Sequence, residues 1–565
     1  MFEFIDLPDF PILRPDAEAY EILLIQPRSN VFANGEFIGN ADKMSAANKY
    51  RDFFRIASEI DPDLVLTPEY SCPWNTVGEL LRTGPLPNVG KLWAIGCEAI
   101  TPKAFREFVN QNNGFDWRYD ANTLDKPGVF LDSVCYIWRL PHQQNGLQFA
   151  VTVQFKVTPM VETQEFLEQE KLIRGDKRYV FRNNANSIYL TTIICSDSLS
   201  FNMSQLPDGY LHQPYLILQP QLNTNPRHGQ FKKFRSDAYK QASPNKEFLC
   251  YNWARGSEIP ALRIKIEFAG SALYTKTKFV HFTDQTVNLN HGRGMYYTRC
   301  HADYYGAFFF NFDEHVFHCR VTKCSQAAVL AAQAQPIPPE LQNVYEWDAT
   351  NNCWASCTPS DGFSGLCASV GADVSPLTSP ALNPVDKERL LFLSCGLVNE
   401  MKPPWYNFQQ LGFFSIADDE IIKRMTFSHD PNASAVAERA RFLGNFSILR
   451  NNILMNQALY PPCLKYLAGH GQIHYPIDDA GRIAYEFNFW APSKPPATVA
   501  YVGVTTSPYA RQCFDSMSTV LRENRGRLVV WYSDHTGFVA LSESESAATV
   551  DKNLTEDPRS IAKEE

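Results

Sequence analysis

Three side chains that can take part in acyl transfer each follow a run of apolar residues. Glu69 ends the stretch LVLTPE, Lys156 follows VTVQF, and Cys195 follows TTII. A thiolate can attack a carbonyl or nitrile carbon, and a carboxylate can take up and return protons. An ammonium can stabilise a developing oxyanion and favour the thiolate. These residue types suit a site that forms a covalent acyl intermediate.

The elements that would carry these residues alternate between strands and helices over the first 325 residues. Runs rich in Val, Ile and Leu predict strands that are apolar on both faces, as in a sheet covered on both sides. The pattern therefore predicts an α/β layered domain. Because the carboxyl ends of strands in such a domain meet at one rim, we expect Glu69, Lys156 and Cys195 to converge there. The predicted strands include residues 21–27, 63–69, 91–100, 129–140, 147–155, 187–197, 214–220, 247–254 and 269–276.

In this order, the three stretches resemble the nitrilase (carbon–nitrogen hydrolase) superfamily. The family has a Glu after a strand, a Lys after a later strand and a Cys in a stretch of the form ICxD. The matching residues here are Pro68-Glu69, Phe155-Lys156 and Ile194-Cys195-Ser196-Asp197. Stretches further along, LILQPQL, EFLCYN and FAGSALY, resemble later parts of the family pattern. The resemblance covers residues 15–325 and implies a four-layer αββα sandwich.

The resemblance also implies roles for single residues. Cys195 looks like the nucleophile, and Glu69 looks like the general base that activates the thiol and later the water. Lys156, with the backbone N–H of Ser196, looks like the group that stabilises the oxyanion. Ser196 and Asn252 are the candidate substrate-binding residues.

Many members of the family carry a second glutamate shortly after the lysine. Glu162 fits that place by spacing, and Glu165 is the alternative. The resemblance implies no metal and no organic cofactor. It does imply a homo-oligomer, because such domains commonly dimerise through the face near the nucleophile.

Two departures from the family pattern bear on the substrate. Ser196 stands where many members have a larger residue, and the Trp-Glu that often follows the cysteine in nitrilases is absent. We therefore expect a cysteine-dependent hydrolase of a non-peptide C–N bond, and the sequence favours an amide over a nitrile as its substrate. Acyl transfer to an amine instead of water stays open.

A second hypothesis is that the chain has no catalytic activity. A cysteine inside IIC is often a core thiol, and a glutamate or lysine after a strand is often a surface residue. The chain would then be an inactive or sensor-type nitrilase-fold module whose C-terminal region binds a protein partner. The size of the region after residue 325 motivates this alternative, because a simple hydrolase would not need it.

Beyond residue 325 the composition changes. Residues 326–385 are rich in Pro, Ala, Ser and Cys and predict a linker region, whereas 386–541 predict a smaller α/β or α+β domain of unknown role. Residues 542–565 are polar and acidic and predict a disordered tail. The chain has no Walker motif and no ATP-pyrophosphatase glycine loop, which disfavours a synthetase that receives ammonia from the first domain.

Charge and hydropathy exclude several classes of protein. The 52 basic residues against 61 acidic ones give a net charge of −9, which disfavours binding to nucleic acid or to an anionic membrane. No apolar run reaches the roughly 20 residues of a membrane helix, and the first residues lack a signal-peptide pattern. Fourteen cysteines in 565 residues are too few for a disulfide scaffold. We expect a cytoplasmic protein with free thiols.

Overall fold

The computed structural model divides the chain into two compact units. The first comprises Met1–Asp361 and Phe414–Ile422, and the second comprises Gly362–Phe413 and Lys423–Glu565. The residues that the structure describes are 1–7, 10–14, 17, 19–144, 146–160, 167–183, 188–201, 215–227, 229–240, 246–265, 270–276, 283–300, 305–322, 339–371, 373–398, 413–415, 420–430, 432–477, 482–521 and 526–543.

The first unit is a mixed α/β structure with two large mixed sheets. One sheet has nine strands, and its central strands β2, β5 and β6 run parallel because helices connect them. Strand β5, with the sequence LVLTPEYSC, is buried along its whole length, as its apolar start predicts. In order across the sheet, the strands are β21 (Cys353–Ser356), β20 (Glu340–Asp348), β19 (His315–Thr322), β2 (Ala19–Gln26), β5 (Leu64–Cys72), β6 (Leu92–Ile100), β8 (Leu131–Gln144), β9 (Leu147–Phe155) and β7 (Asp116–Tyr119).

The second sheet has ten strands, of which β11, β12 and β13 are parallel neighbours. In order, the strands are β1 (Phe2–Asp6), β10 (Arg178–Arg182), β11 (Tyr189–Thr192), β12 (Tyr215–Pro220), β13 (Lys246–Tyr251), β16 (Ala272–Lys276), β18 (Tyr305–Phe310), β17 (Met295–Cys300), β22 (Phe413–Ser415) and β23 (Ile421–Ile422).

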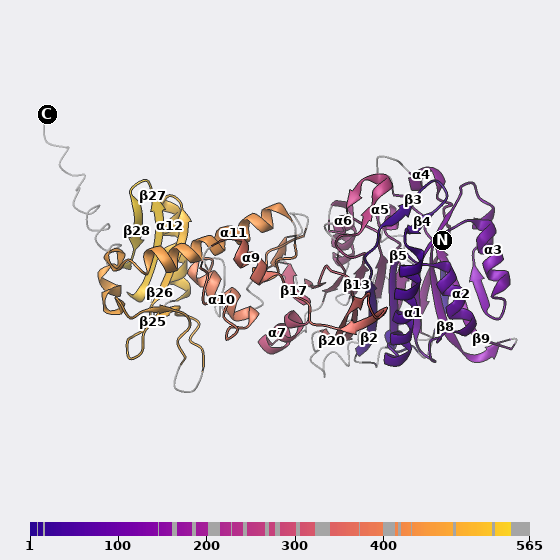
Figure 1. Ribbon diagram of the computed structural model, residues 1–565, viewed down its shortest axis with the longest axis horizontal. Helices are drawn as coiled ribbons and strands as arrows, with labels where there is room; N and C mark the ends of the chain where they lie inside the picture. The colour runs from indigo at the N-terminus through magenta and orange to yellow at the C-terminus, as the bar shows by residue number, and fades with distance from the viewer. Residues whose placement is uncertain are drawn as a thin grey trace, which may run out of the picture. The chain divides into compact units, whose positions relative to one another are not determined.

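The two sheets face each other, and helices cover their outer faces. Tyr136 of β8 meets Phe181 of β10 at 4.8 Å between ring centroids. On the outer face of the nine-stranded sheet lie α1 (Lys43–Ile60) and α2 (Trp74–Thr83), side by side (Figure 1). Phe54 of α1 stacks on Trp93 of β6. On the outer face of the other sheet, Phe234 of α6 (Gly229–Tyr239) packs against Phe248.

Shorter elements connect the strands of the first unit or lie at their ends. They are η1 (Pro11–Leu13), β3 (Val31–Ala33), β4 (Ile38–Asn40), α3 (Pro102–Gln111), η2 (Ala121–Asp125), α4 (Leu167–Lys171), α5 (Asp197–Ser200), β14 (Glu258–Ile259), η5 (Pro260–Leu262), β15 (Ile264–Lys265) and α7 (Asp284–Gly292).

The boundaries of the first unit differ from those expected from the sequence, which ended the domain at residue 325 and placed a linker at 326–385. Strand β20 pairs with β19, and β21 pairs with β20, so both belong to the nine-stranded sheet. Leu341 and Val344 of β20 are buried, and a bulge at Gln342 puts both on the same face of the strand although they are three residues apart. The Pro, Ala and Ser residues on either side of this strand predicted a linker instead. Residues 414–422, expected in the C-terminal domain, also belong to the first unit.

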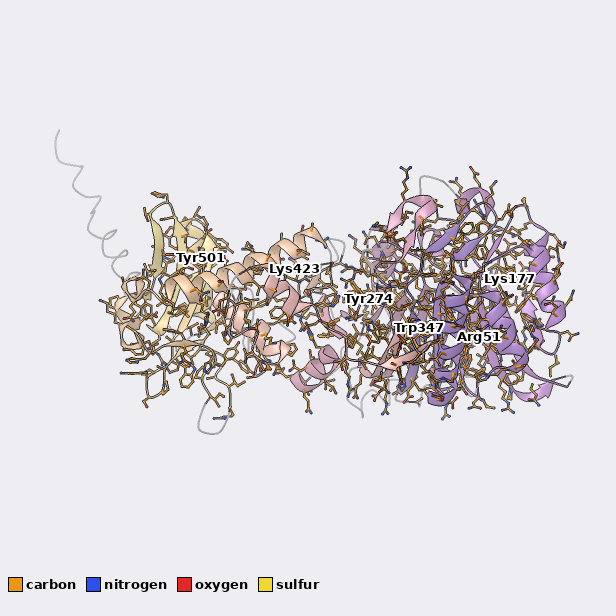
Figure 2. The ribbon with its side chains drawn as sticks, viewed as in Figure 1. Arg51, Lys177, Tyr274, Trp347, Lys423 and Tyr501 are labelled. Atoms are coloured by element: carbon orange, nitrogen blue, oxygen red, sulfur yellow. The ribbon has the colours of Figure 1, made fainter. Side chains whose placement is uncertain are left out.

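The second unit contains a strand–helix–strand motif. Helix α12 (Ser507–Val520) connects β26 (Thr498–Val504) to the parallel strand β27 (Leu528–Asp534), and β28 (Gly537–Leu541) completes the sheet (Figure 1). The hydroxyl oxygen of Tyr501, a residue labelled in Figure 2, lies 2.8 Å from Ser533 Oγ. The other elements are α9 (Phe363–Ser369), α10 (Pro384–Ser394), α11 (Ala433–Ile448), a π-helical turn η7 (Leu449–Ile453), η8 (Gln457–Leu459), η9 (Pro462–Leu467), β24 (Gln472–Ile473) and β25 (Phe489–Trp490).

Within the described ranges, no helix has both the length and the apolar character needed to cross a membrane.

Candidate active site

Glu69 reaches the site through an interruption in the pairing of β5 with β6. Thr67 pairs with Ile95 and Cys72 with Cys97, so residues 68–71 stand opposite Gly96 alone. Pro68 has no N–H and cannot continue the ladder. A side chain at position 96 would not fit, because a Cβ there would lie 2.1 Å from the carbonyl oxygen of Pro68. The resulting bulge changes the direction in which the Glu69 side chain leaves the strand.

The Glu69 side chain is held from several directions. The backbone N–H of Leu222 donates to Glu69 Oε2 at 2.6 Å, and the indole of Trp253 donates to the Glu69 carbonyl oxygen at 2.8 Å. The adjacent Tyr70 has φ +56°, in the left-handed region. These contacts fix the carboxylate in one position before any substrate arrives.

Lys156 directly follows β9, and its ammonium contacts two carboxylates. Nζ donates to Glu69 Oε1 at 2.7 Å and to both carboxylate oxygens of Glu168 at 2.8 Å. Glu168 comes from α4 and also accepts hydrogen bonds from the Tyr70 hydroxyl and from the backbone N–H of Met160. The Lys156 side chain is 1% exposed, so these ion pairs are dry.

Cys195 lies in a tight turn between β11 and α5. Its φ is +38°, a left-handed conformation that costs a non-glycine residue roughly 1–3 kcal/mol. The turn is held because Cys195 N–H donates to the carbonyl oxygen of Pro220, and the N–H and hydroxyl of Ser198 donate to the Cys195 carbonyl oxygen. A strained turn of this kind presents the thiol at the end of the strand.

The turn after Cys195 is fastened to the loop that follows Lys156. Asp197 Oδ1 accepts the backbone N–H groups of Val157 and Thr158, at 2.8 and 2.6 Å. The aspartate of the ICxD stretch therefore couples the positions of the lysine and the cysteine, which come from different sheets.

Electrostatics set the protonation states of the cysteine and the lysine. Burial raises the pKa of the Cys195 thiol well above its usual value, the Glu69 carboxylate raises it further, and the Lys156 ammonium opposes the rise. Burial acts to lower the pKa of Lys156, but the carboxylates of Glu168 and Glu69 outweigh it, so this pKa is raised. The resting site therefore holds a neutral thiol and a charged ammonium.

A third carboxyl group, Asp132 of β8, lies 3.6 Å from Lys156 Nζ and is fully buried. Burial and the neighbouring charge of Glu69 raise the pKa of Asp132 well above its usual value, which favours the neutral form of this carboxyl group. Oxygen atoms of Glu69, Asp132 and Glu168 lie within 4.8 Å of one another, a spacing that could hold a cation. Because the Lys156 ammonium already contacts all three groups, a metal ion there would have to displace it.

These groups open onto a small cavity of about 100 Å³. Its catalytic-type residues lie on one side, and the rest of its wall is mainly apolar. The lining residues are Ala33, Ile38, Glu69, Tyr70, Lys156, Met160, Leu167, Glu168, Cys195, Leu222, Asn223, Thr224, Ile259, Leu262 and Ile264.

The two candidate substrate-binding residues have partners inside the protein. Ser196 is buried, and its hydroxyl donates to the carbonyl oxygen of Thr158 at 2.7 Å. The Asn252 side chain exchanges two hydrogen bonds with the backbone of Asn223. Asn252 thus holds the loop whose neighbouring residue, Leu222, donates to Glu69.

The structure brings Glu69, Lys156 and Cys195 together at one cavity, whereas Glu162 and Glu165 lie outside the described residues. Glu168 contacts Lys156 and was not singled out from the sequence. Several glutamates follow Lys156, and spacing alone does not choose among them. Tyr70 and Asp132 were also missed, although Tyr70 directly follows the Pro-Glu pair.

Comparisons with other proteins add little to this geometry. No protein-family model and no curated protein sequence matches the chain. One similar solved structure is that of a glutamine-dependent NAD(+) synthetase from Cytophaga hutchinsonii, with 10% sequence identity over 96% of this chain and 68% of that chain. Its TM-score of 0.27 is too low to support an argument about fold or function.

Proposed function

We propose that the first unit is a nitrilase-like hydrolase of a non-peptide C–N bond, acting on amides in preference to nitriles through a thioester at Cys195. Its two large mixed sheets support this proposal, and the four-layer αββα sandwich is part of it. The observation that carries the proposal is the Lys156 ammonium, bonded to two buried carboxylates in the cavity that the Cys195 thiol lines.

The first half of the reaction uses Glu69 as a base. Because the thiol is neutral at rest, its proton must move to Glu69 as the sulfur attacks the amide carbon. A C–S bond forms, and the carbonyl oxygen becomes an oxyanion that Lys156 and the backbone N–H of Ser196 stabilise. The C–N bond then breaks, and the nitrogen leaves as ammonia or an amine with the proton that Glu69 had accepted.

The second half of the reaction uses the same residues. Glu69 removes a proton from water, the hydroxide attacks the thioester, and the C–S bond breaks. The sulfur regains a proton, and a carboxylic acid leaves. An amine entering in place of water would give acyl transfer, which product analysis separates from hydrolysis.

We assign the role of the second glutamate to Glu168, whereas Glu162 and Glu165 lie outside the described residues. The two oxygens of Glu168 accept hydrogen bonds from Lys156 Nζ and so direct the ammonium toward the reacting carbonyl. Asn252 acts as a positioning residue, because it holds the loop that donates to Glu69.

The experiment is ammonia release from a panel of amides and nitriles, with intact-protein mass measured at short reaction times. We expect turnover and an acyl adduct on Cys195, and both should disappear in Cys195→Ala. Cys250→Ala is the matched control, since Cys250 is also a buried thiol that follows the same kind of apolar run. Undiminished turnover by the purified Cys195→Ala protein would contradict the mechanism.

The alternative, a module without catalysis whose C-terminal region binds a protein partner, predicts a different result. A thiol assisted by Glu69 and Lys156 should react with iodoacetamide faster than the other buried cysteines, whereas a core thiol should not. A homo-oligomer also stays a prediction, and light scattering of the full chain tests it.

A further inference from the structure

Two short hairpins form the apolar side of the cavity. Strands β3 and β4 contribute Ala33 and Ile38, and the β14–η5–β15 segment contributes Ile259, Leu262 and Ile264. The two hairpins belong to one apolar cluster that also contains the buried Tyr70, Phe130 and Trp253. The part of the wall that these hairpins form is therefore built from packed hydrocarbon.

Charges on the cavity wall are already paired. Among the lining residues that the structure describes, Lys156 is the one cation, and Glu69 and Glu168 accept its hydrogen bonds. The other polar groups among these lining residues are those of Tyr70, Cys195, Asn223 and Thr224. The Tyr70 hydroxyl donates to Glu168, and the Asn223 backbone is bonded to Asn252. A carboxylate or ammonium on the substrate would lose its water here without gaining an opposite charge, which is costly.

We infer that the cavity selects carboxamides with a neutral aliphatic acyl group of a few carbon atoms, and that it rejects amides bearing a carboxylate or an ammonium. The inference rests on the proposed function and adds a substrate class to it. The apolar hairpins enclose the acyl chain while the amide group faces Cys195. The volume of about 100 Å³ limits the length of that chain.

The first test compares amides by ammonia release. From acetamide to propanamide to butanamide, kcat/KM should rise about three- to four-fold per added methylene until the cavity is full. Butanamide should exceed succinamate and glutamine, which carry charges, by about 100-fold or more. Turnover of glutamine or succinamate equal to that of butanamide would overturn the substrate class and leave the hydrolase intact.

The second test changes the wall. Leu262→Arg adds a cation to the lining and should narrow the gap between butanamide and succinamate at least ten-fold, chiefly by lowering the KM for succinamate. Ala261→Arg is the matched control, because Ala261 is exposed and does not line the cavity. An equal change in both variants, or none in Leu262→Arg, would contradict the assignment of this wall to the acyl chain.

The third test does not depend on turnover. Saturation-transfer NMR on the Cys195→Ala full chain should detect butanamide and not succinamate or glutamine. If no amide is hydrolysed by the intact protein but this binding preference holds, the proposed hydrolase fails and the preference of the cavity stands. Binding of glutamine or succinamate as strong as that of butanamide would overturn the inference.

Discussion

At the scale of single residues, the described part of the site places the Lys156 ammonium among three carboxyl groups. Lys156 Nζ donates to Glu69 and Glu168, and Asp132 Oδ2 lies 3.6 Å away. Three ionised carboxylates around one ammonium would leave two uncompensated negative charges in a dry site. A proton on Asp132 reduces this excess, in agreement with the raised pKa of Asp132.

This charge state predicts how stability depends on pH. The folded protein keeps the Asp132 proton at pH values where the unfolded chain has lost it, because burial and Glu69 raise the pKa of Asp132. The free energy of unfolding should therefore fall as pH rises above about 4, by up to about 1.4 kcal/mol per pH unit while Asp132 stays protonated. Asp132→Asn removes the titrating group. Its Tm relative to the natural chain should rise with pH above about 4.

The control for this prediction is Asp125→Asn, because the Asp125 side chain is 75% exposed. Its Tm difference from the natural chain should stay nearly constant over the same pH range. A Tm difference for Asp132→Asn that does not change with pH would show that the native state does not hold the extra proton.

Glu168 gives a second prediction at this scale. Glu168→Gln keeps the shape of the side chain but removes one of the two negative charges that hold the Lys156 ammonium. We expect kcat for butanamide to fall about 10²–10³-fold with little change in KM, since the charge acts mainly on the transition state. Tyr70→Phe removes only one hydrogen bond to Glu168, so its effect should be about ten-fold or less. Equal losses in both variants would contradict the assignment.

At the scale of elements, the bulge in β5 depends on a glycine in the neighbouring strand. A Cβ at Gly96 would lie 2.1 Å from the Pro68 carbonyl oxygen and 2.6 Å from the Pro68 carbonyl carbon, both of which are backbone atoms. Gly96→Ala should therefore push the bulge and Glu69 out of place. We expect a loss of roughly 1–3 kcal/mol in stability and a loss of most turnover.

Gly114→Ala is the matched control, because nothing lies within 4 Å of a Cβ at that exposed position. Its Tm and its ammonia release should stay close to those of the natural chain. Normal turnover in Gly96→Ala would show that the bulge adapts without moving Glu69.

Elements also explain how much of the site could be predicted from the sequence. Glu69, Lys156 and Cys195 each come directly after an apolar run in the sequence, and these runs mark their positions. Glu168 lies on a five-residue helix with no such marker. The strands β20 and β21 were not predicted, because the Pro, Ala and Ser residues around them favour a linker and the bulge at Gln342 interrupts the alternation in ELQNVYEWD. Pairing partners that lie far apart in the chain set these elements, and one local window does not contain them.

At the scale of the whole molecule, the first unit is completed by residues from far along the chain. Glu420 accepts hydrogen bonds from Arg235 Nε at 3.0 Å and Nη2 at 2.8 Å. The hydroxyl of Tyr274, labelled in Figure 2, also donates to it, and all three residues are buried. Arg235 belongs to α6, which packs against α5 beside Cys195. Residues 414–422 thus supply the counter-charge for a helix near the nucleophile.

This ion pair predicts that Arg235→Met changes the Tm in opposite directions in two forms of the protein. In the full chain, Arg235→Met leaves Glu420 buried without its partner, and the free energy of unfolding should fall by roughly 3–5 kcal/mol. In a fragment of residues 1–361, Glu420 is absent and Arg235 is itself an uncompensated buried charge. Arg235→Met should therefore raise the Tm of the fragment while it lowers the Tm of the full chain. Arg51→Met, at an exposed position on α1 that is labelled in Figure 2, should have a small effect in both. A change of Tm in the same direction in both forms on Arg235→Met would contradict the role of residues 414–422. It would mean that the Arg235 guanidinium has a complete set of partners in the fragment, so that its removal does not stabilise the fragment.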